Sequence, residues 1–286
     1  MDRKNKMAGI QLAVLRFLVY TVIILLCFLC LFFFVMLIVN ASRTNNQLQR
    51  GFTLIPGGHF IYNLKNAFTD SSIQIPRGMI NSFIVAAGSS ICTTYFSALT
   101  AYGIYVYNFK FKKLAYTFII AVMMIPTQVS AVGFVQLAYK YGLTNKLWVL
   151  IVPSIAAPAV FFYMYQYLKA TLPLDIVEAS RIDGSSEFVT FNKIVLPIMK
   201  PAIAVQMIFS FVAAWNNYFL PALLLTKSEK KTVPIMIAQL RSADYSKFDM
   251  GKVYMFILLA ILPVIVVYIF LSKSIIKGVT SGSVKG

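Results

Sequence analysis

The residues of this chain that could do chemistry are few and widely spaced. His59 is the only histidine, and in its glycine-rich surroundings we expect a solvated loop residue rather than a ligand or a catalytic base. Cys27 and Cys30 form a C-x-x-C pair, but it lies inside an unbroken apolar run, so neither a disulfide nor a metal site follows. No Ser/His/Asp set, metal cluster or carboxylate pair lies within an apolar block. The sequence therefore disfavours an enzyme that acts inside a membrane.

Acidic residues are concentrated in one segment, residues 173–197. Asp175, Glu178, Asp183 and Glu187 lie there, which is four of the nine acidic residues of the chain. The same segment spaces apolar residues at helical intervals and lies between two strongly apolar blocks. A segment of this kind lies on a membrane or against a partner instead of crossing the bilayer.

Proline and glycine indicate how this acidic segment folds. Pro173 has a fixed backbone angle that suits the first turn of a helix, and Asp175 and Glu178 would lie near the positive end of the helix dipole. Gly184 permits a sharp change of direction, and Pro197 marks the entry to the next apolar block. The sequence predicts a helix, a glycine turn and a second short helix.

A second polar group interrupts a later apolar block: Trp215, Asn216, Asn217 and Tyr218. Unpaired amides in hydrocarbon cost several kcal/mol, so Asn216 and Asn217 should face a partner helix or an aqueous pathway. Indole faces and amides also suit a sugar, which offers an apolar ring face and many hydroxyls. Gln128 is a similar candidate in an earlier block. Packing between helices, or a belt at the membrane interface, is an equally open interpretation of each residue.

The composition defines the class of protein that must position these groups. Of the 286 residues, 59% are hydrophobic and 12% are charged, which is more apolar surface than one globular core can hide. Apolar blocks long enough to cross about 30 Å of hydrocarbon recur along the chain. We expect an all-α polytopic membrane protein, with a transmembrane domain over residues 15–272 between an N-terminal segment, residues 1–14, and a tail, residues 273–286. The six expected transmembrane helices cover residues 15–39, 80–107, 114–138, 147–168, 198–225 and 253–271.

In two of these spans, the residue types indicate whether the helix faces other helices, water or lipid. The span over residues 80–107 repeats small and hydroxyl residues, which favours close packing against other helices over exposure to lipid. The residues concerned are Ser82, Ser89, Ser90, Thr93, Thr94, Ser97, Thr100 and Ala101. In the span over residues 114–138, Pro126 removes a backbone donor beside Thr127 and Gln128. A kinked helix that faces protein or water is predicted there.

The charge of the chain is +17, but its distribution argues against nucleic acid as a partner. The 26 Lys and Arg residues are scattered through short loops, and no basic face appears. Loop charges that anchor helices at lipid headgroups explain this pattern better. Because Lys and Arg divide almost equally between the two sides, the charges leave the orientation open.

The acidic segment also carries a motif. Its residues match every defined position but one of the pattern E-A-A-x-x-x-G-x9-I-x-L-P, and Ser180, which replaces the second alanine, is still small. The matching residues are Glu178, Ala179, Gly184, Ile194, Leu196 and Pro197. This loop resembles the signature of permease subunits in ABC importers. The stretches over residues 123–153, 214–225 and 278–286 are similar to the carbohydrate-uptake branch of these permeases, in particular to MalG-like permeases.

The resemblance implies an assembly in the bacterial cytoplasmic membrane, with both termini in the cytoplasm. Its other parts would be a second homologous permease subunit, a cytoplasmic ABC ATPase dimer and an extracytoplasmic solute-binding protein that delivers a sugar or oligosaccharide. An amphipathic coupling helix between the fourth and fifth spans would dock in the ATPase. Small residues would let the ATPase approach, and charged residues would make polar contacts at the rim. The coupling residues would be Glu178, Ala179, Ser180, Arg181, Asp183 and Gly184.

ATP chemistry is expected in another polypeptide. The pair Gly251-Lys252 lacks the upstream glycine of a G-x-x-x-x-G-K-[ST] loop, so ATP and Mg would be bound by the ATPase subunits. The chain itself is then not an enzyme. Two alternatives to a sugar permease stay open: an importer permease for an amino acid or peptide, and a membrane scaffold without transport activity.

Overall fold

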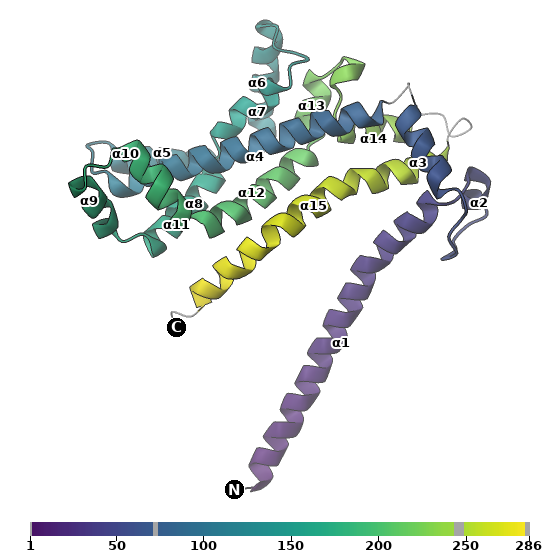
Figure 1. Ribbon diagram of the computed structural model, residues 1–286, viewed down its shortest axis with the longest axis horizontal. Helices are drawn as coiled ribbons and strands as arrows, with labels where there is room; N and C mark the ends of the chain where they lie inside the picture. The colour runs from purple at the N-terminus through teal and green to yellow at the C-terminus, as the bar shows by residue number, and fades with distance from the viewer. Residues whose placement is uncertain (1, 71–73, 243–248, 284–286) are drawn as a thin grey trace. The chain divides into compact units, whose positions relative to one another are not determined.

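The computed structural model describes residues 2–70, 74–242 and 249–283. Every regular element over these residues is a helix (Figure 1), which confirms the all-α class. The chain divides into two compact units. The first comprises residues 1–69 and 243–259, and the second comprises residues 70–242 and 260–286.

The first unit contains the longest apolar helix. α1 (Asp2–Ala41) carries a candidate membrane span over Leu12–Ala41, and only 6% of its most apolar stretch is buried. Apolar side chains exposed along a whole helix are expected where lipid or another membrane subunit covers them. Two short helices follow, α2 (Asn45–Gln49) and α3 (Phe60–Thr69), and α15 (Met250–Ser283) begins in this unit.

The second unit is built along α4 (Ile75–Val106). α8 (Pro158–Thr171) and α12 (Lys200–Trp215) both pack along it (Figure 1). The small and hydroxyl residues that predicted close packing are buried on α4, with the exception of Thr100, which is exposed. Small side chains let helix backbones approach closely, so they form the seam of this unit.

Three further candidate spans are bent helix pairs, each with a proline in the break or within the first two residues after it. By length and apolar composition, three described helices could cross a membrane, or up to six if each bent pair is one span. The expected kink at Pro126 is a full break: α5 ends at Met123 and α6 begins at Thr127, directly after a proline that removes a backbone donor. The pairs are α5 (Lys112–Met123) with α6 (Thr127–Lys140) at 94°, α7 and η1 (Trp148–Ile155) with α8 at 41°, and Glu187–Ile198 with α12 at 82°.

The fifth expected span, residues 198–225, is shorter in the structure. α12 ends at Trp215, and a separate helix, α13 (Phe219–Leu224), follows. Pro221, within α13, has no N–H to donate to the carbonyl of Asn217, so one helical hydrogen bond is missing at this break. The connection that follows also contains helical turns, which are η3 (Ser228–Lys230) and α14 (Val233–Ser242).

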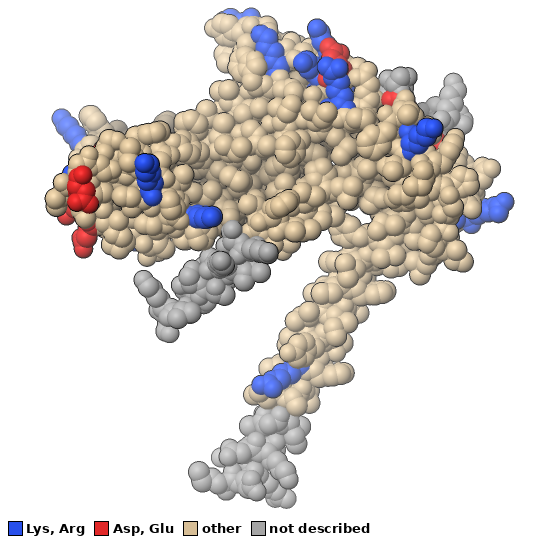
Figure 2. All heavy atoms as spheres, viewed as in Figure 1, with Lys and Arg blue, Asp and Glu red and all other residues tan. Residues whose placement is uncertain are grey.

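Charged side chains on the visible face of the second unit lie at its two ends. In Figure 2, acidic and basic groups gather over the end that carries α9 and α10, and again near α13, with uncharged surface between them. This distribution is expected of a body that crosses hydrocarbon, where ionised groups are costly.

Candidate functional site

The acidic segment begins with the helix that its sequence predicts. α9 (Leu174–Ile182) starts directly after Pro173. Asp175 lies in the first turn and Arg181 in the last, so both charges complement the helix dipole. The segment continues through α10 (Glu187–Thr190), a π-helical turn, η2 (Phe191–Val195), and α11 (Leu196–Ile198).

A glycine ends α9, as predicted. Gly184 has a φ of +78°, a conformation that other residues adopt only with strain. Its N–H donates to the carbonyl of Arg181 and the N–H of Ser185 donates to the carbonyl of Ser180, both at 3.0 Å. These two bonds form a Schellman motif, which satisfies the last carbonyls of the helix. The predicted helix, glycine turn and second helix are therefore confirmed.

One face of this segment is buried and linked by hydroxyl groups. Val177, Ser180 and Thr190 are 1%, 5% and 0% exposed. Ser180 Oγ donates to the carbonyl of Val177 at 2.7 Å and lies 3.1 Å from Thr190 Oγ1, which donates to Ser185 Oγ. The small side chain of Ser180 therefore packs within this chain, whereas the sequence predicts that it gives an ATPase room to approach.

The opposite face is open and mixed in chemistry. Glu178, Ala179 and Asp183 are exposed there, together with the turn at Gly184. Two large apolar side chains that the sequence analysis missed are also exposed, Ile182 at 86% and Phe188 at 67%. Their signal in the sequence is helical spacing, because Ile182 lies off the face that Val177 and Ser180 share. Exposed apolar side chains beside charged ones are typical of a docking surface.

Arg181 bonds within the chain. Its Nε donates to Glu187 Oε1 at 2.7 Å, and its guanidinium lies 5.4 Å from the centre of the Tyr107 ring. Tyr102, on α4, donates its hydroxyl to Glu187 Oε2 at 3.0 Å. The Glu187 carboxylate raises the pKa of Arg181 further above its ordinary value, so the guanidinium stays charged. These contacts tie α9 to α10 and to the end of α4.

An aromatic cluster joins the same segment to α4 more firmly. Phe191 is fully buried, with its ring centre 5.7 Å from that of Tyr95 and 5.4 Å from that of Tyr102. Tyr95 also donates its hydroxyl to Asn192 Oδ1 at 3.2 Å. Aromatic side chains bury large areas in fixed relative orientations. The cluster therefore packs the segment that follows α10 directly against α4.

Trp215 has the surroundings of a packing residue. It is 3% exposed, its ring stacks on Phe211 with centres 5.8 Å apart, and its Nε1 donates to the carbonyl of Ala260 at 3.1 Å. The indole thus has a partner for its N–H and for its ring face. Of the two interpretations of this residue, the structure supports packing between helices.

Asn217, which is itself exposed, instead lines an open cavity of about 310 Å³ in the second unit. Ser89 and Thr93 of α4, Ser154 of η1 and Ser210 of α12 supply the other hydroxyl groups of its wall. Thr93 and Ser154 use theirs within the chain, since Thr93 Oγ1 donates to the carbonyl of Ser154 at 2.9 Å and Ser154 Oγ to that of Ser89 at 3.2 Å. Among the described residues, no side-chain hydrogen bond forms at Asn217 or Ser210, so both can bond a solute or water.

The other pathway candidates are separated by the fold. Asn216 and Tyr218 are exposed in the break between α12 and α13. Gln128 is exposed in the first turn of α6, where its Oε1 accepts from Thr127 Oγ1 at 3.3 Å. Neither Gln128 nor Asn216 lines the cavity beside Asn217.

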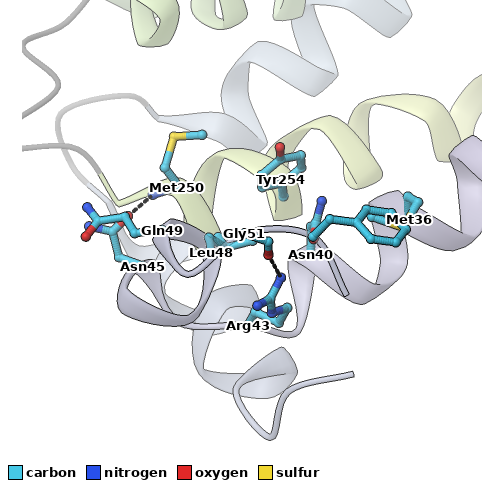
Figure 3. Close-up of a pocket in the computed structure, with 10 residues that line it drawn as sticks. Met36, Asn40, Arg43, Asn45, Leu48, Gln49, Gly51, Met250 and Tyr254 are labelled. Carbon is cyan, nitrogen blue, oxygen red and sulfur yellow. Dashed lines mark hydrogen bonds between the residues drawn. The ribbon is translucent and has the colours of Figure 1, made fainter. Parts of the chain in front are cut away.

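The first unit has a larger cavity of about 580 Å³, which sequence reasoning missed (Figure 3). Asn40, Asn45 and Gln49 contribute amides to its lining, and Arg43 is 6% exposed. The Arg43 guanidinium donates to the carbonyl of Gly51 at 3.2 Å and to that of Gln47. This arginine therefore closes the turn around α2. Across the described residues, no three His, Cys, Asp or Glu side chains come together as a metal site.

Comparison with known proteins shows that the sequence of this chain matches a protein family. A model described as "Binding-protein-dependent transport system inner membrane component" matches residues 90–279. The chain is 30% identical over 282 residues to the arabinooligosaccharides transport system permease protein AraQ of Bacillus subtilis, covering 96% of this chain and 98% of AraQ. It is 29% identical to the trehalose/maltose transport system permease protein MalG of Thermococcus litoralis, covering 92% of this chain and 94% of that protein.

A solved structure has the same fold. The crystal structure of a bacterial ABC transporter involved in the import of the acidic polysaccharide alginate superposes with a TM-score of 0.77 at 18% identity. The match covers 96% of this chain and 98% of that one. The overall fold of the chain is thus shared with a chain of a bacterial ABC transporter.

Proposed function

The chain belongs to the family of binding-protein-dependent transport system inner membrane components, and from this premise we propose that it is the permease subunit of an ATP-driven importer for a sugar or oligosaccharide. The observation that carries the proposal is its similarity, over nearly the whole chain, to permeases named for arabinooligosaccharides and for trehalose and maltose. The chain is a multi-pass protein of the bacterial cytoplasmic membrane. Both termini face the cytoplasm.

The exposed face of α9 and α10 is the docking site for the ATPase. Ala179 leaves space for a partner surface, Glu178 and Asp183 provide polar contacts, and Ile182 and Phe188 provide apolar area. The buried face of the segment is joined to α4 through Tyr102 and Phe191. Movement of the ATPase subunits would therefore tilt α4 and the helices packed on it, and so alternate access to the solute.

The cavity beside Asn217 lies on the solute pathway. A sugar hydroxyl can both donate and accept, which suits the free amide of Asn217 and the hydroxyl of Ser210. The second homologous permease would complete the pathway, and an extracytoplasmic binding protein would deliver the solute. An ABC ATPase dimer would bind ATP and Mg and perform the hydrolysis.

Purification of the tagged chain from its native membranes, followed by reconstitution, tests the proposal. We expect an ABC ATPase and a second permease to co-purify, and proteoliposomes containing the complex and its binding protein to accumulate labelled oligosaccharides with ATP. Uptake of amino acids or peptides in place of sugars would support the other importer function. If no ATPase co-purified with the intact chain, a scaffold without transport activity would replace the permease proposal.

Asn217→Ala tests the pathway separately. We expect the complex to assemble normally and uptake to fall about tenfold, because a hydrogen bond to a hydroxyl of the bound solute is lost. Assembly is measured by size-exclusion chromatography, and uptake is measured per assembled complex. Loss of assembly with normal uptake per remaining complex would instead assign Asn217 to helix packing.

A further inference from the structure

Asn145 lies in the loop between α6 and α7 and holds the end of α13. Its backbone has a φ of +60°, a left-handed conformation that asparagine tolerates better than most residues. Its N–H donates to the carbonyl of Leu224, the last residue of α13, at 2.8 Å. A helix end leaves such carbonyls without helical partners, so Asn145 takes the place of the missing turn.

The side chain of Asn145 binds the residues that leave α13. Its Oδ1 accepts from the N–H groups of Thr226 and Lys227, both at 2.8 Å, and its Nδ2 donates to Thr226 Oγ1 at 2.9 Å. Asn145 and Thr226 are 81 positions apart in sequence, so this is a tertiary connection. We call the set of bonds from Asn145 to residues 224–227 the Asn145 latch.

Neighbouring contacts show what the latch joins. Tyr139, near the end of α6, donates its hydroxyl to the carbonyl of Leu223 at 3.0 Å. Ala138, Val149 and Leu224 form a small buried cluster between α6, α7 and α13. These elements therefore pack as one body, and α6 and α13 each follow a break in the helix before them.

The position of α13 matters for the cavities. Leu220 lines both the cavity beside Asn217 and a second cavity of about 470 Å³, which α6 residues including Ser130 and Phe134 also line. A displacement of α13 would therefore change both cavities at once. The latch opposes that displacement, since backbone and side chain of one residue bind four groups.

We propose that Asn145 is a positioning residue for transport, which couples α13 to the α6–α7 loop so that Leu220 moves only together with α6. This inference rests on the proposed function of the chain as an importer permease. Without the latch, α13 moves independently of the ATPase cycle, and ATP is hydrolysed without delivery of solute. The ratio of solute imported to ATP hydrolysed is the quantity that reports this.

The test compares two substitutions in the full reconstituted complex. Asn145→Gly removes the side chain but keeps the left-handed backbone, and Asn145→Asp keeps the Oδ1 acceptor. We expect Asn145→Gly to lower the ratio of imported solute to hydrolysed ATP roughly fivefold, the effect of about one net hydrogen bond. Assembly should stay unchanged, the melting temperature should fall only slightly because the lost bonds are exposed to solvent, and Asn145→Asp should restore most of the ratio. An unchanged ratio in Asn145→Gly would overturn the proposal.

Hydrogen exchange separates failure of the latch from failure of the proposed function. In the wild-type complex we expect slow exchange at the amides of Thr226 and Lys227, and faster exchange in Asn145→Gly. This measurement needs no transported solute, so it tests the latch even if the wild-type complex imports no sugar. Equal exchange at both amides in the two proteins would overturn the latch, whereas absent uptake by the wild type would overturn only the sugar importer.

Discussion

Trp215 and Asn217 are two positions apart in the chain, yet the fold gives them different surroundings. Trp215 points into the helix packing and donates to the carbonyl of Ala260, whereas Asn217 lines a cavity with a free amide. The sequence allows the same two interpretations for both residues, helix packing or solute contact. Only the direction in which each side chain points in the structure distinguishes a packing role from a transport role. Asn217 is therefore the residue whose loss should affect uptake, and Trp215 the one whose loss should affect folding.

Trp215→Phe should destabilise the chain by about 1–3 kcal/mol, since it removes one buried hydrogen bond and leaves space beside Phe211. Thermal unfolding of the purified complex in detergent measures this loss. Uptake per assembled complex should stay at the wild-type level. A variant with normal stability but reduced uptake would instead place Trp215 on the solute pathway.

The angle between the short helices α9 and α10 is set by a single glycine, Gly184. Gly184 combines a φ of +78° with an N–H that donates to Arg181, and a proline can supply neither. The segment is anchored to α4 through Phe191, which directly follows α10 and lies outside the turn at Gly184. A change at residue 184 should therefore alter the exposed face while the helices within the membrane stay in place.

Gly184→Pro should leave membrane insertion intact and uncouple ATP hydrolysis from uptake, because it misdirects α9 against the ATPase. Insertion is checked by expression in the membrane fraction, and coupling by ATPase activity and uptake in proteoliposomes. Gly184→Asn is the matched control: asparagine tolerates positive φ and keeps the N–H, so we expect coupling close to wild type. Normal transport by Gly184→Pro would contradict the coupling role of the segment.

At the scale of the whole molecule, the structure leaves large apolar surfaces uncovered. Over the part of the chain that the structure describes, α1 is exposed along its candidate span, and Ile182 and Phe188 are exposed beside the acidic segment. Lipid and neighbouring membrane subunits are suitable partners for α1, whereas the mixed face at α9 and α10 suits a soluble protein. The chain is thus built as one part of a larger assembly.

Replacing both Ile182 and Phe188 with serine should weaken ATPase binding about a hundredfold or more, because burial of each side chain contributes roughly 1.5–3 kcal/mol. Both side chains are exposed, so the permease itself should fold normally. Co-purification of the ATPase with increasing salt and detergent gives the measurement. Ile61→Ser, at a residue 72% exposed on α3, is the control and should retain the ATPase. If both variants retained the same amount of ATPase, Ile182 and Phe188 would not be part of the docking face.

The sequence by itself determined the membrane class, the helical fold, and the helix, glycine turn and second helix around Gly184. These features depend on composition, helical spacing and the backbone limits of proline and glycine, all of which are local properties. Only the tertiary structure decided that Ser180 faces inward, that Trp215 packs against α15, and that Asn145 reaches Thr226. Each of these depends on contacts between residues far apart in the chain, or on which side of a helix packs against its neighbours. A single sequence does not specify those neighbours.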